Sequence, residues 1–316
     1  MKIVFFGSSQ FAVPSLKALK SAGYKIACVI TQPDKQRGRG LHLEGTAVKQ
    51  IAQDYKLRIY QPQGINTPET INFIKELNPD LFVVVSYGQI LSKGILNLPS
   101  IFAINAHASI LPKYRGAAPI NWAIINGEQS SGVTIIKMTE KMDAGPIIMQ
   151  KQIHIKGDDT SMTLTEKLSQ LAAELLVGSL KQIEDNDYKL MPQAGPVSFA
   201  PKLKKEDGLI DWGSPVQNIY NLIRGCLSWP GAFTHYKGKL LKIYRAEVCR
   251  LAGLPVCRLP GEIIKVDKDA IIVATGEGNL IIEELQIEGK RRMKVEEFIA
   301  GHKVSAGERM VYSAHT

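Results

Sequence analysis

The chain has 316 residues, which exceeds the usual size of one domain and predicts two, each large enough for its own core. Lysine and arginine number 39 against 30 acidic residues, and the formal charge of +9 favours a polyanionic partner such as nucleic acid. The four cysteines lack the paired spacing of metal ligands, and we expect reduced thiols. The N-terminus shows no export signal and no apolar run could span a bilayer, so we expect a cytoplasmic protein without membrane contact.

Strand-like and helix-like patterns alternate over residues 1–187. Such alternation predicts a parallel sheet that is covered on both faces. The predicted strands are residues 3–6, 26–30, 81–85, 101–104 and 133–138. The predicted helices are residues 11–22, 46–55, 68–77 and 161–183.

The pattern changes after residue 189. Residues 190–207 combine prolines, a glycine and a basic cluster, and we interpret them as a linker. A helix around residues 215–224 comes next, and then hairpins separated by turn-forming residues, which predict a small β-barrel. The expected organisation is a catalytic domain over 1–189, the linker over 190–207 and a β-barrel domain over 208–316. The predicted barrel strands are residues 239–248, 261–266, 270–274 and 279–287.

One segment gathers the group types that an acyl or formyl transfer site needs. Asn105 and His107 stand two apart after the strand predicted at 101–104, so both side chains should project from one face. Asp143 follows the next predicted strand, in a turn-forming loop. Ligands of open α/β sheets bind outside the carboxyl ends of the strands. Alone, each residue has an ordinary structural interpretation as a turn former or an interior histidine; together they predict one site.

The same segment resembles the signature of the formyltransferases that use 10-formyltetrahydrofolate. The likeness lies in Asn105-Ala106-His107-Ala108-Ser109-Ile110-Leu111-Pro112, in its continuation to Pro119 and in Asp143-Ala144-Gly145. It extends along the whole chain, through Lys2-Ile3-Val4-Phe5-Phe6-Gly7, Thr31-Gln32-Pro33-Asp34, Gly38-Arg39-Gly40, Ile210-Asp211-Trp212 and Trp229-Pro230-Gly231. The clearest departure is Ser8-Ser9-Gln10, where the family usually has a Thr-Pro-acidic turn, and it bears on loop shape.

Within that family the flanking residues are most similar to the branch that formylates methionyl initiator tRNA. The resemblance implies a Rossmann-like catalytic domain and a C-terminal OB-like β-barrel that helps to hold the tRNA. It implies 10-formyltetrahydrofolate as a consumed co-substrate, no metal and a monomer that supports translation initiation. A dinucleotide site is disfavoured, because the turn after the first strand has only Gly7 where the G-x-G-x-x-G motif requires three glycines.

The resemblance assigns catalysis to Asn105, His107 and Asp143. Formyl transfer needs a neutral amine, stabilisation of a developing oxyanion and a proton for the leaving nitrogen. The Asn105 amide can donate to the oxyanion, and His107 as imidazolium can donate to the same oxygen or supply the proton. Asp143 would orient His107 or relay a proton from the amine through water, and the sequence does not decide between these roles.

The resemblance also implies two binding regions. Residues that line the folate site would be Ser109, Ile110, Leu111 and Pro112, together with Tyr87, Gly88, Gln89, Ile90 and Leu91. Apolar residues after a strand are commonly core, which is the alternative for the second group. Residues 32–43 form a polar, glycine-rich loop in which Lys35, Arg37 and Arg39 would reach the tRNA acceptor end, with Arg39 at the key basic position. A solvated loop is the alternative there, as it is for the basic cluster at 290–294.

Three other functions remain open from the sequence. A formyltransferase acting on a sugar-nucleotide amine shares the catalytic segment, although the loop around Arg39 argues against it. A glycinamide ribonucleotide formyltransferase usually has a single domain. A catalytically silent RNA-binding protein on the same scaffold would have no need of the intact Asn105, His107 and Asp143 set.

Overall fold

The computed structural model describes residues 1–37, 42–250 and 259–312. Its contacts divide the chain into two compact units. The first unit comprises Met1–Pro119, Ser130–His154 and Thr165–Pro201, and the second comprises Ile120–Gln129, Ile155–Leu164 and Lys202–Thr316. Residues up to Pro201, within the segment expected as a linker, therefore group with the first unit. No helix in these described ranges is long and apolar enough to cross a membrane.

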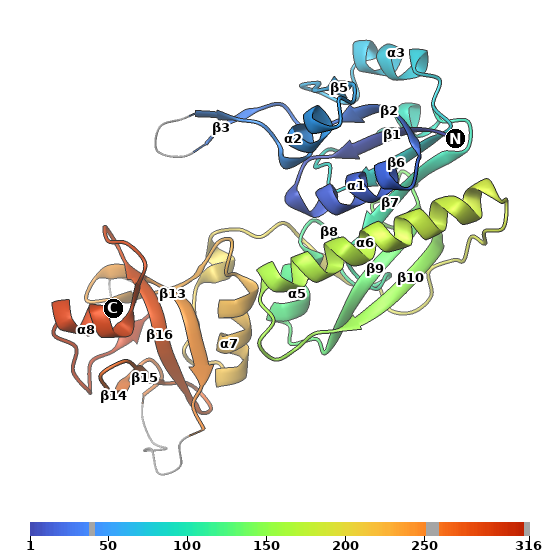
Figure 1. The fold of residues 1–316 in the computed structure, drawn as a ribbon. Helices are drawn as coiled ribbons and strands as arrows, with labels where there is room; N and C mark the ends of the chain where they lie inside the picture. Colours follow the sequence, from blue (N-terminus) through green and yellow to red (C-terminus); the bar gives the residue numbers. More distant parts are fainter. Residues whose placement is uncertain (38–41, 251–258, 313–316) are drawn as a thin grey trace. The chain divides into compact units, whose positions relative to one another are not determined.

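The first unit is built on one sheet with the strand order β10-β9-β7-β6-β1-β2-β5 (Figure 1). The parallel Rossmann-like sheet that the sequence predicts is confirmed for β1 (Lys2–Gly7), β2 (Lys25–Ile30), β6 (Leu81–Val85) and β7 (Phe102–His107). A short strand that was not predicted, β5 (Ile59–Tyr60), pairs in parallel with β2. All five residues of β6 are buried, as expected for a parallel strand covered on both faces. The central strands therefore read as continuous apolar runs, which is why the sequence locates them.

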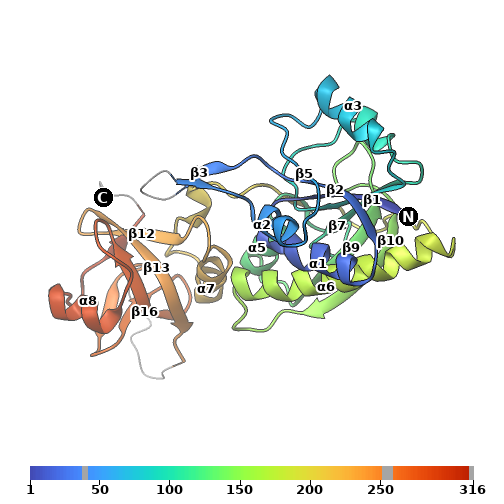
Figure 2. The same ribbon diagram turned by 45° about the horizontal axis from the view of Figure 1, so that its top comes forward.

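Threonine side chains cap the start of two helices in the first unit. The Thr46 and Thr67 hydroxyls accept hydrogen bonds from the backbone N–H groups of Lys49 and Thr70, which fixes the start of two helices. In Figures 1 and 2, α1 and α6 run side by side along the sheet. The helical segments are η1 (Gln10–Ala12), α1 (Val13–Ser21), α2 (Ala47–Asp54), α3 (Pro68–Glu76), α4 (Lys93–Leu96) and α6 (Ser161–Glu184).

The sheet departs from parallel order at one edge. β9 (Ser130–Lys137) runs antiparallel to β7, and β10 (Ile147–His154) runs antiparallel to β9. The alternation of patterns suggested a parallel strand at 133–138, and that direction is wrong. A parallel connection needs a crossover element that packs back over the sheet. Here the intervening helix α5 (Pro119–Ile125) groups mostly with the second unit and does not act as a crossover over the first sheet. β9 therefore starts at the end of the sheet where β7 finishes, and runs in the opposite direction.

The second unit is a curled antiparallel sheet, which confirms the predicted OB-like class. Its order is β14-β15-β16-β13-β12-β18, with β17 paired to β16. Alternate residues of the long strand β16 are buried, so one face covers a core that contains Trp212 and residues of α7 (Val216–Gly225) and α8 (Val295–Gly301). The strands are β12 (Ala232–Tyr236), β13 (Lys239–Val248), β14 (Ile263–Val266), β15 (Ile271–Ala274), β16 (Asn279–Ile287), β17 (Met293–Lys294) and β18 (Met310–Val311).

Gly276 closes one end of this sheet and gives a stability prediction. Its N–H donates to the carbonyls of Trp212 and Ser214 at 2.8 and 3.1 Å, and an added Cβ would lie 1.9 Å from the carbonyl oxygen of Gly213. Since backbone cannot yield as a flexible side chain does, we expect Gly276→Ala to lower the free energy of unfolding by about 1–3 kcal/mol. Urea unfolding followed by tryptophan fluorescence measures this, because Trp122, Trp212 and Trp229 all belong to the second unit.

Gly301→Ala is the matched control for this prediction. A Cβ at Gly301 would meet nothing within 4 Å, and the residue ends helix α8. It should therefore leave the unfolding midpoint unchanged or raise it slightly. Equal midpoints for the two variants would contradict the steric argument at Gly276.

The cysteines of the described chain are free thiols, as expected. Cys28 and Cys226 are buried, and desolvation raises the pKa of each thiol to about 12. A thiol in this state is unreactive at neutral pH. Cys257 lies outside the described residues.

Candidate active site

The structure brings Asn105, His107 and Asp143 together on one face of the first sheet. Asn105 and His107 lie on β7, and Asp143 lies in the loop between β9 and β10. The Asn105 Nδ2 donates to Asp143 Oδ1 at 3.3 Å. His107 Nδ1 lies 3.5 Å from Asp143 Oδ2. The Asp143 carboxylate therefore lies within hydrogen-bonding distance of the Asn105 amide and within ion-pair distance of the His107 imidazole.

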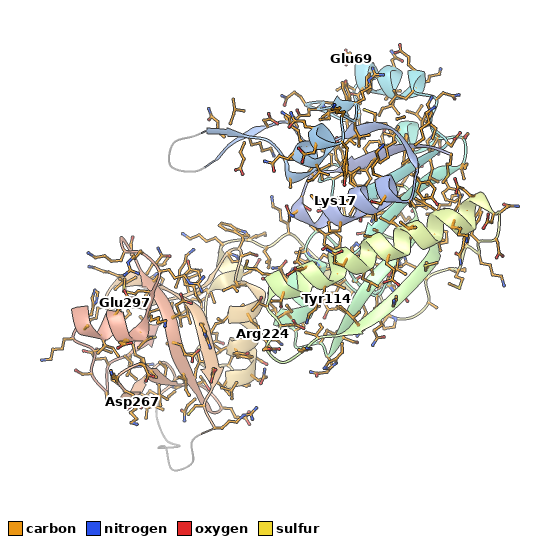
Figure 3. The ribbon with its side chains drawn as sticks, in the orientation of Figure 1. Lys17, Glu69, Tyr114, Arg224, Asp267 and Glu297 are labelled. Carbon is orange, nitrogen blue, oxygen red and sulfur yellow. The ribbon has the colours of Figure 1, made fainter. Side chains whose placement is uncertain are left out.

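His107 is enclosed on both sides by oxygen atoms. Its side chain is 6% exposed, and its Nε2 lies 2.8 Å from the carbonyl oxygen of Tyr114, a residue labelled in Figure 3. Its Nδ1 faces the Asp143 carboxylate. A carbonyl and an ionised carboxylate can only accept hydrogen bonds, so a ring that is protonated on both nitrogens can donate to each of them. The surroundings of His107 thus suit a proton donor.

The Asp143 carboxylate is fixed by its backbone as well as by the two side chains. Asp143 has a φ of 50°, in the left-handed region that aspartate tolerates better than most residues. Its Oδ2 also accepts a hydrogen bond from the Gly116 N–H at 2.9 Å. An added Cβ on Gly145 would lie 1.8 Å from the carbonyl oxygen of Lys137, so only glycine allows the loop to close here.

This loop reaches the site by a path that the sequence did not indicate. In the register of β7 and β9, Ile104 pairs with Lys137 and His107 pairs with Thr134. β9 therefore ends at the far end of β7 from His107. Residues 138–146 must turn back along the sheet to place Asp143 beside His107. The expectation that Asp143 follows the carboxyl end of a neighbouring parallel strand is wrong, although the side chains meet.

Residues 109–112 are held rigidly beside the cluster. Ser109 is 1% exposed; its Oγ donates to the Lys113 carbonyl at 2.6 Å, and its own carbonyl accepts from Thr134 Oγ1 at 2.7 Å. Leu111 is buried against Ile136 and Ile147, and Pro112 is buried as well. Ile110 is half-buried and is the member of this group whose side chain remains partly accessible. Residues 109–112 therefore form a rigid boundary beside the cluster.

Residues 87–91 divide into core and accessible positions. Tyr87 and Leu91 are buried, and the Tyr87 ring packs edge-to-face against Phe6 with 5.5 Å between centroids. Ile90 is 67% exposed, and Gly88 is exposed with a φ of 90°. Among the hydrogen bonds of the described chain, none is donated by the backbone N–H groups of residues 88–91. Of the residues that carry these amides, Gly88 and Ile90 are exposed and Leu91 is buried.

The basic loop is more regular than expected. β3 (Lys35–Arg37) and β4 (His42–Glu44) form an antiparallel hairpin, which contradicts the interpretation of residues 32–43 as too polar and glycine-rich to form an element. The backbone groups of β3 and β4 hydrogen-bond to each other, so the hairpin can form without an apolar face packed against a core. At its base, hydrogen bonds from Gln61 and Lys49 hold the pKa of the Asp34 carboxyl below its usual value. Lys35 is exposed, and Arg39 lies outside the described residues.

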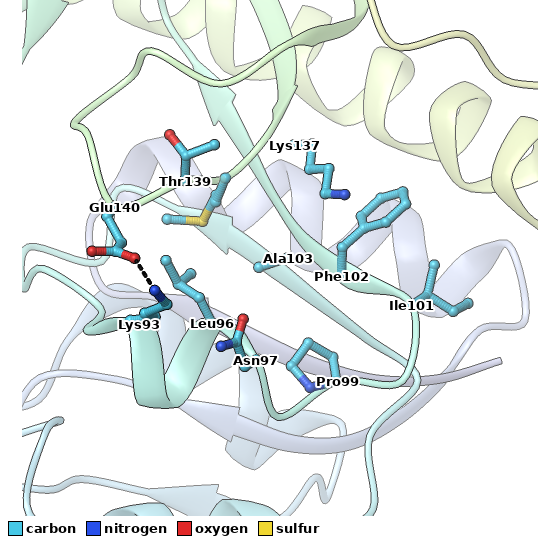
Figure 4. A pocket seen from close by; sticks show the side chains of 11 residues that line it. Lys93, Leu96, Asn97, Pro99, Ile101, Phe102, Ala103, Lys137, Thr139 and Glu140 are labelled. Atoms are coloured by element: carbon cyan, nitrogen blue, oxygen red, sulfur yellow. Dashed lines mark ion pairs between the residues drawn. The ribbon is translucent and has the colours of Figure 1, made fainter.

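A separate cavity of about 450 Å³ lies elsewhere in the first unit (Figure 4). It is lined by α4, the start of β7 and residues 137–140, and it contains none of the three clustered side chains. Lys93 Nζ lies 3.3 Å from Glu140 Oε1, the ion pair drawn in Figure 4. Their side chains are 73% and 61% exposed, so the pair contributes roughly 0–1 kcal/mol. Within the described ranges, no group of three or more His, Cys, Asp or Glu side chains could hold a metal.

Three contributions to the cluster were not predicted from the sequence. The Tyr114 carbonyl and the Gly116 N–H are backbone groups, and their residue types give no signal for such a role. Gln193 contacts the Asp143 loop although it lies in the segment interpreted as a linker. The only available hint was that residues 113–119 continue the recognised motif.

Comparisons with known proteins match this chain over most of its length. The family model described as formyl transferase matches residues 1–180, and the model for the formyl transferase C-terminal domain matches residues 202–303. A methionyl-tRNA formyltransferase of Caldanaerobacter subterraneus subsp. tengcongensis is 47% identical over 311 residues, which cover 97% of this chain and 99% of the relative. The methionyl-tRNA formyltransferase of Acetivibrio thermocellus is 44% identical over 309 residues, covering 98% of this chain and 99% of the relative.

Solved structures share the fold at lower identity. The sugar 3N-formyl transferase WlaRD, solved with dTDP and 5-N-formyl-THF, has a TM-score of 0.67 and 21% identity over 92% of this chain and 99% of its own. HypX from Aquifex aeolicus, solved with tetrahydrofolic acid, has a TM-score of 0.65 and 18% identity. The match covers 95% of this chain but 47% of HypX. At these identities the likeness concerns the fold alone.

Proposed function

The chain belongs to the formyl transferase family, and from this membership we propose that it transfers the formyl group of 10-formyltetrahydrofolate to the amino group of methionyl initiator tRNA. The product would support translation initiation in the cytoplasm. The observation that supports this most directly is the cluster of Asn105, His107 and Asp143 around one carboxylate. We propose these three side chains as the catalytic residues.

Each side chain has a role that its contacts allow. 10-Formyltetrahydrofolate supplies the activated formyl group. Asn105 uses one amide hydrogen on Asp143 and has a second to donate to the formyl oxygen as charge develops there. His107 can donate a proton toward the leaving nitrogen or the same oxygen once its Nε2 exchanges the Tyr114 carbonyl for the substrate. Asp143 orients His107 or relays the proton of the amine, and both roles need its carboxylate where the loop holds it. The transfer so described uses no metal ion.

We propose that the folate ring lies against the segment that follows β6. A pterin presents hydrogen-bond acceptors and donors along one edge, and residues 88–91 offer backbone amides that have no partner in the described chain. We propose that Tyr87, Gly88, Gln89, Ile90 and Leu91 line this side of the folate site, with Ser109, Ile110, Leu111 and Pro112 on the other. Tyr87 and Leu91 are both buried, so in this arrangement they anchor the segment in the core and thereby hold residues 88–90 in place.

The tRNA is proposed to bind the basic hairpin and the second unit. Lys35, Arg37 and Arg39 would contact phosphates of the acceptor end. The cluster at 290–294 is less available than its composition suggests, because Arg291 pairs with Glu297 and Arg292 pairs with Glu284 and stacks over the Tyr244 ring. We retain the functional division of residues 1–189 for catalysis, 190–207 as connection and 208–316 for tRNA binding, in a monomer.

A transfer assay tests this function. The protein is incubated with 10-formyltetrahydrofolate and separately charged tRNAs, and the formyl group on each aminoacyl-tRNA is measured. We expect formyl-methionine on the initiator tRNA and little product on an elongator tRNA. Transfer to an amino-sugar nucleotide instead would identify the sugar-nucleotide reaction. Absence of formyl release with every acceptor would support a silent RNA-binding protein.

A further inference from the structure

Gln193 bridges the loop of Asp143 to Arg115. We propose that Gln193 is a positioning residue, which sets the Asp143 carboxylate for catalysis by holding the backbone on both sides of Ala144. This inference rests on the proposed catalytic role of Asp143. It concerns a residue in an otherwise exposed segment that has no catalytic signature in the sequence.

All the hydrogen-bonding capacity of the Gln193 amide is used. Its Nε2 donates to the carbonyl oxygens of Asp143 and Gly145 at 2.7 and 2.8 Å. Its Oε1 accepts from Arg115 Nη2 and Nε at 2.6 and 3.2 Å. An amide has two donor hydrogens and two acceptor lone pairs, so these four bonds saturate it. Such a side chain can adopt few other orientations without losing a bond.

The loop needs a restraint of this kind. Asp143 has a φ of 50°, a backbone state that costs of order 1 kcal/mol or more and persists only where the surroundings impose it. Within the loop, the Ala144 N–H donates to the Lys141 carbonyl at 3.3 Å, a long bond. The two bonds from Gln193 hold the Asp143–Ala144 and Gly145–Pro146 peptide groups, and thereby limit rotation of the carboxylate away from His107.

Arg115 fixes the other end of the bridge. Its backbone N–H donates to the Ser198 carbonyl at 2.9 Å, and β8 (Arg115–Gly116) pairs with β11 (Phe199–Ala200). The next residue, Gly116, donates its N–H to Asp143 Oδ2. The same two-residue strand therefore contacts the carboxylate directly and holds Gln193, which in turn holds the loop backbone. All of these residues lie in the first unit.

Only an amide meets both demands at this position. Gln193→Glu would keep the acceptor for Arg115 but place oxygens against two carbonyls, and Gln193→Met would keep the length while removing all four bonds. We expect both variants to lower the single-turnover rate roughly 10- to 100-fold, as small misplacements of catalytic groups do. The KM for each substrate should change less than twofold, because neither substrate touches Gln193 in this scheme.

A double-mutant cycle with Asp143 separates positioning from general damage. If Gln193 acts through the Asp143 carboxylate, Gln193→Met should cause little further loss in Asp143→Asn enzyme. Glu140→Gln is the matched control, since it removes the Lys93 ion pair from the same loop and should leave the rate within twofold. A normal rate for Gln193→Met, or an equal loss in both backgrounds, would overturn the proposal.

Hydrogen exchange tests the inference independently of the reaction. Gln193→Met should accelerate amide exchange in residues 141–145 relative to wild type and to Glu140→Gln, whichever acceptor the enzyme uses. Unchanged exchange in this loop would refute the positioning role even if activity fell. Failure of the wild type to formylate methionyl-tRNA would count against the proposed function, while the exchange result would still decide the role of Gln193.

Discussion

Asp143→Asn is expected to slow formyl transfer by roughly two orders of magnitude or more. The variant keeps the size of the side chain but loses the charge that faces His107 Nδ1 at 3.5 Å and the acceptor pair that holds Asn105 and the Gly116 N–H. His107→Ala and Asn105→Ala should each have an effect of similar size, since each removes a donor from the reacting centre. The measurement is the single-turnover rate with saturating 10-formyltetrahydrofolate and methionyl-tRNA.

Folding must be unaffected for this result to concern catalysis. Asn105 and Asp143 are half-buried and His107 is buried, so urea unfolding of each variant is compared with wild type to separate a loss of stability from a loss of catalysis. Lys93→Met, which removes an exposed ion pair elsewhere in the unit, is the control and should retain full activity. A near-normal single-turnover rate in any one variant of the cluster would remove that residue from the mechanism.

Much of the fold could be predicted because its signals are local. The buried strands β1 and β6 are continuous apolar runs, and the threonine caps at Thr46 and Thr67 mark helix starts a few residues away. The direction of β9 could not be predicted in this way. It depends on whether α5 covers the sheet, and α5 groups with the second unit instead, which is a property of the whole chain.

The site shows the same division between local and distant information. Asn105 and His107 share a strand face by their spacing, and that much follows from the sequence. The contacts of Asp143 with Gly116 and Gln193 join residues that are 27 and 50 positions apart, and they use backbone atoms that no residue pattern reveals. Among residues 87–91, the burial of Tyr87 and Leu91 beside the exposed Ile90 likewise depends on packing against the rest of the sheet.

Arg39→Ala is expected to weaken tRNA binding while leaving binding of 10-formyltetrahydrofolate unchanged. The prediction rests on the motif Gly38-Arg39-Gly40, which lies in the sequence between the paired strands β3 and β4, and on the exposed Lys35 of β3. A phosphate contact releases counterions, so affinity should fall steeply with salt. Loss of one contact should reduce the slope of log affinity against log salt by about one.

A salt series on wild type and two variants decides whether Arg39 contacts the tRNA. Lys151→Ala is the control, because Lys151 lies on β10 and is already paired with Glu174 at 2.8 Å, so its removal should change neither the affinity nor the slope. If Arg39 belongs to a solvated loop, its variant will behave like the control, with equal slopes and equal formylation rates. A reduced slope in Arg39→Ala alone would place a phosphate beside this residue. Such a contact would also give the basic β3–β4 hairpin a function in binding the tRNA.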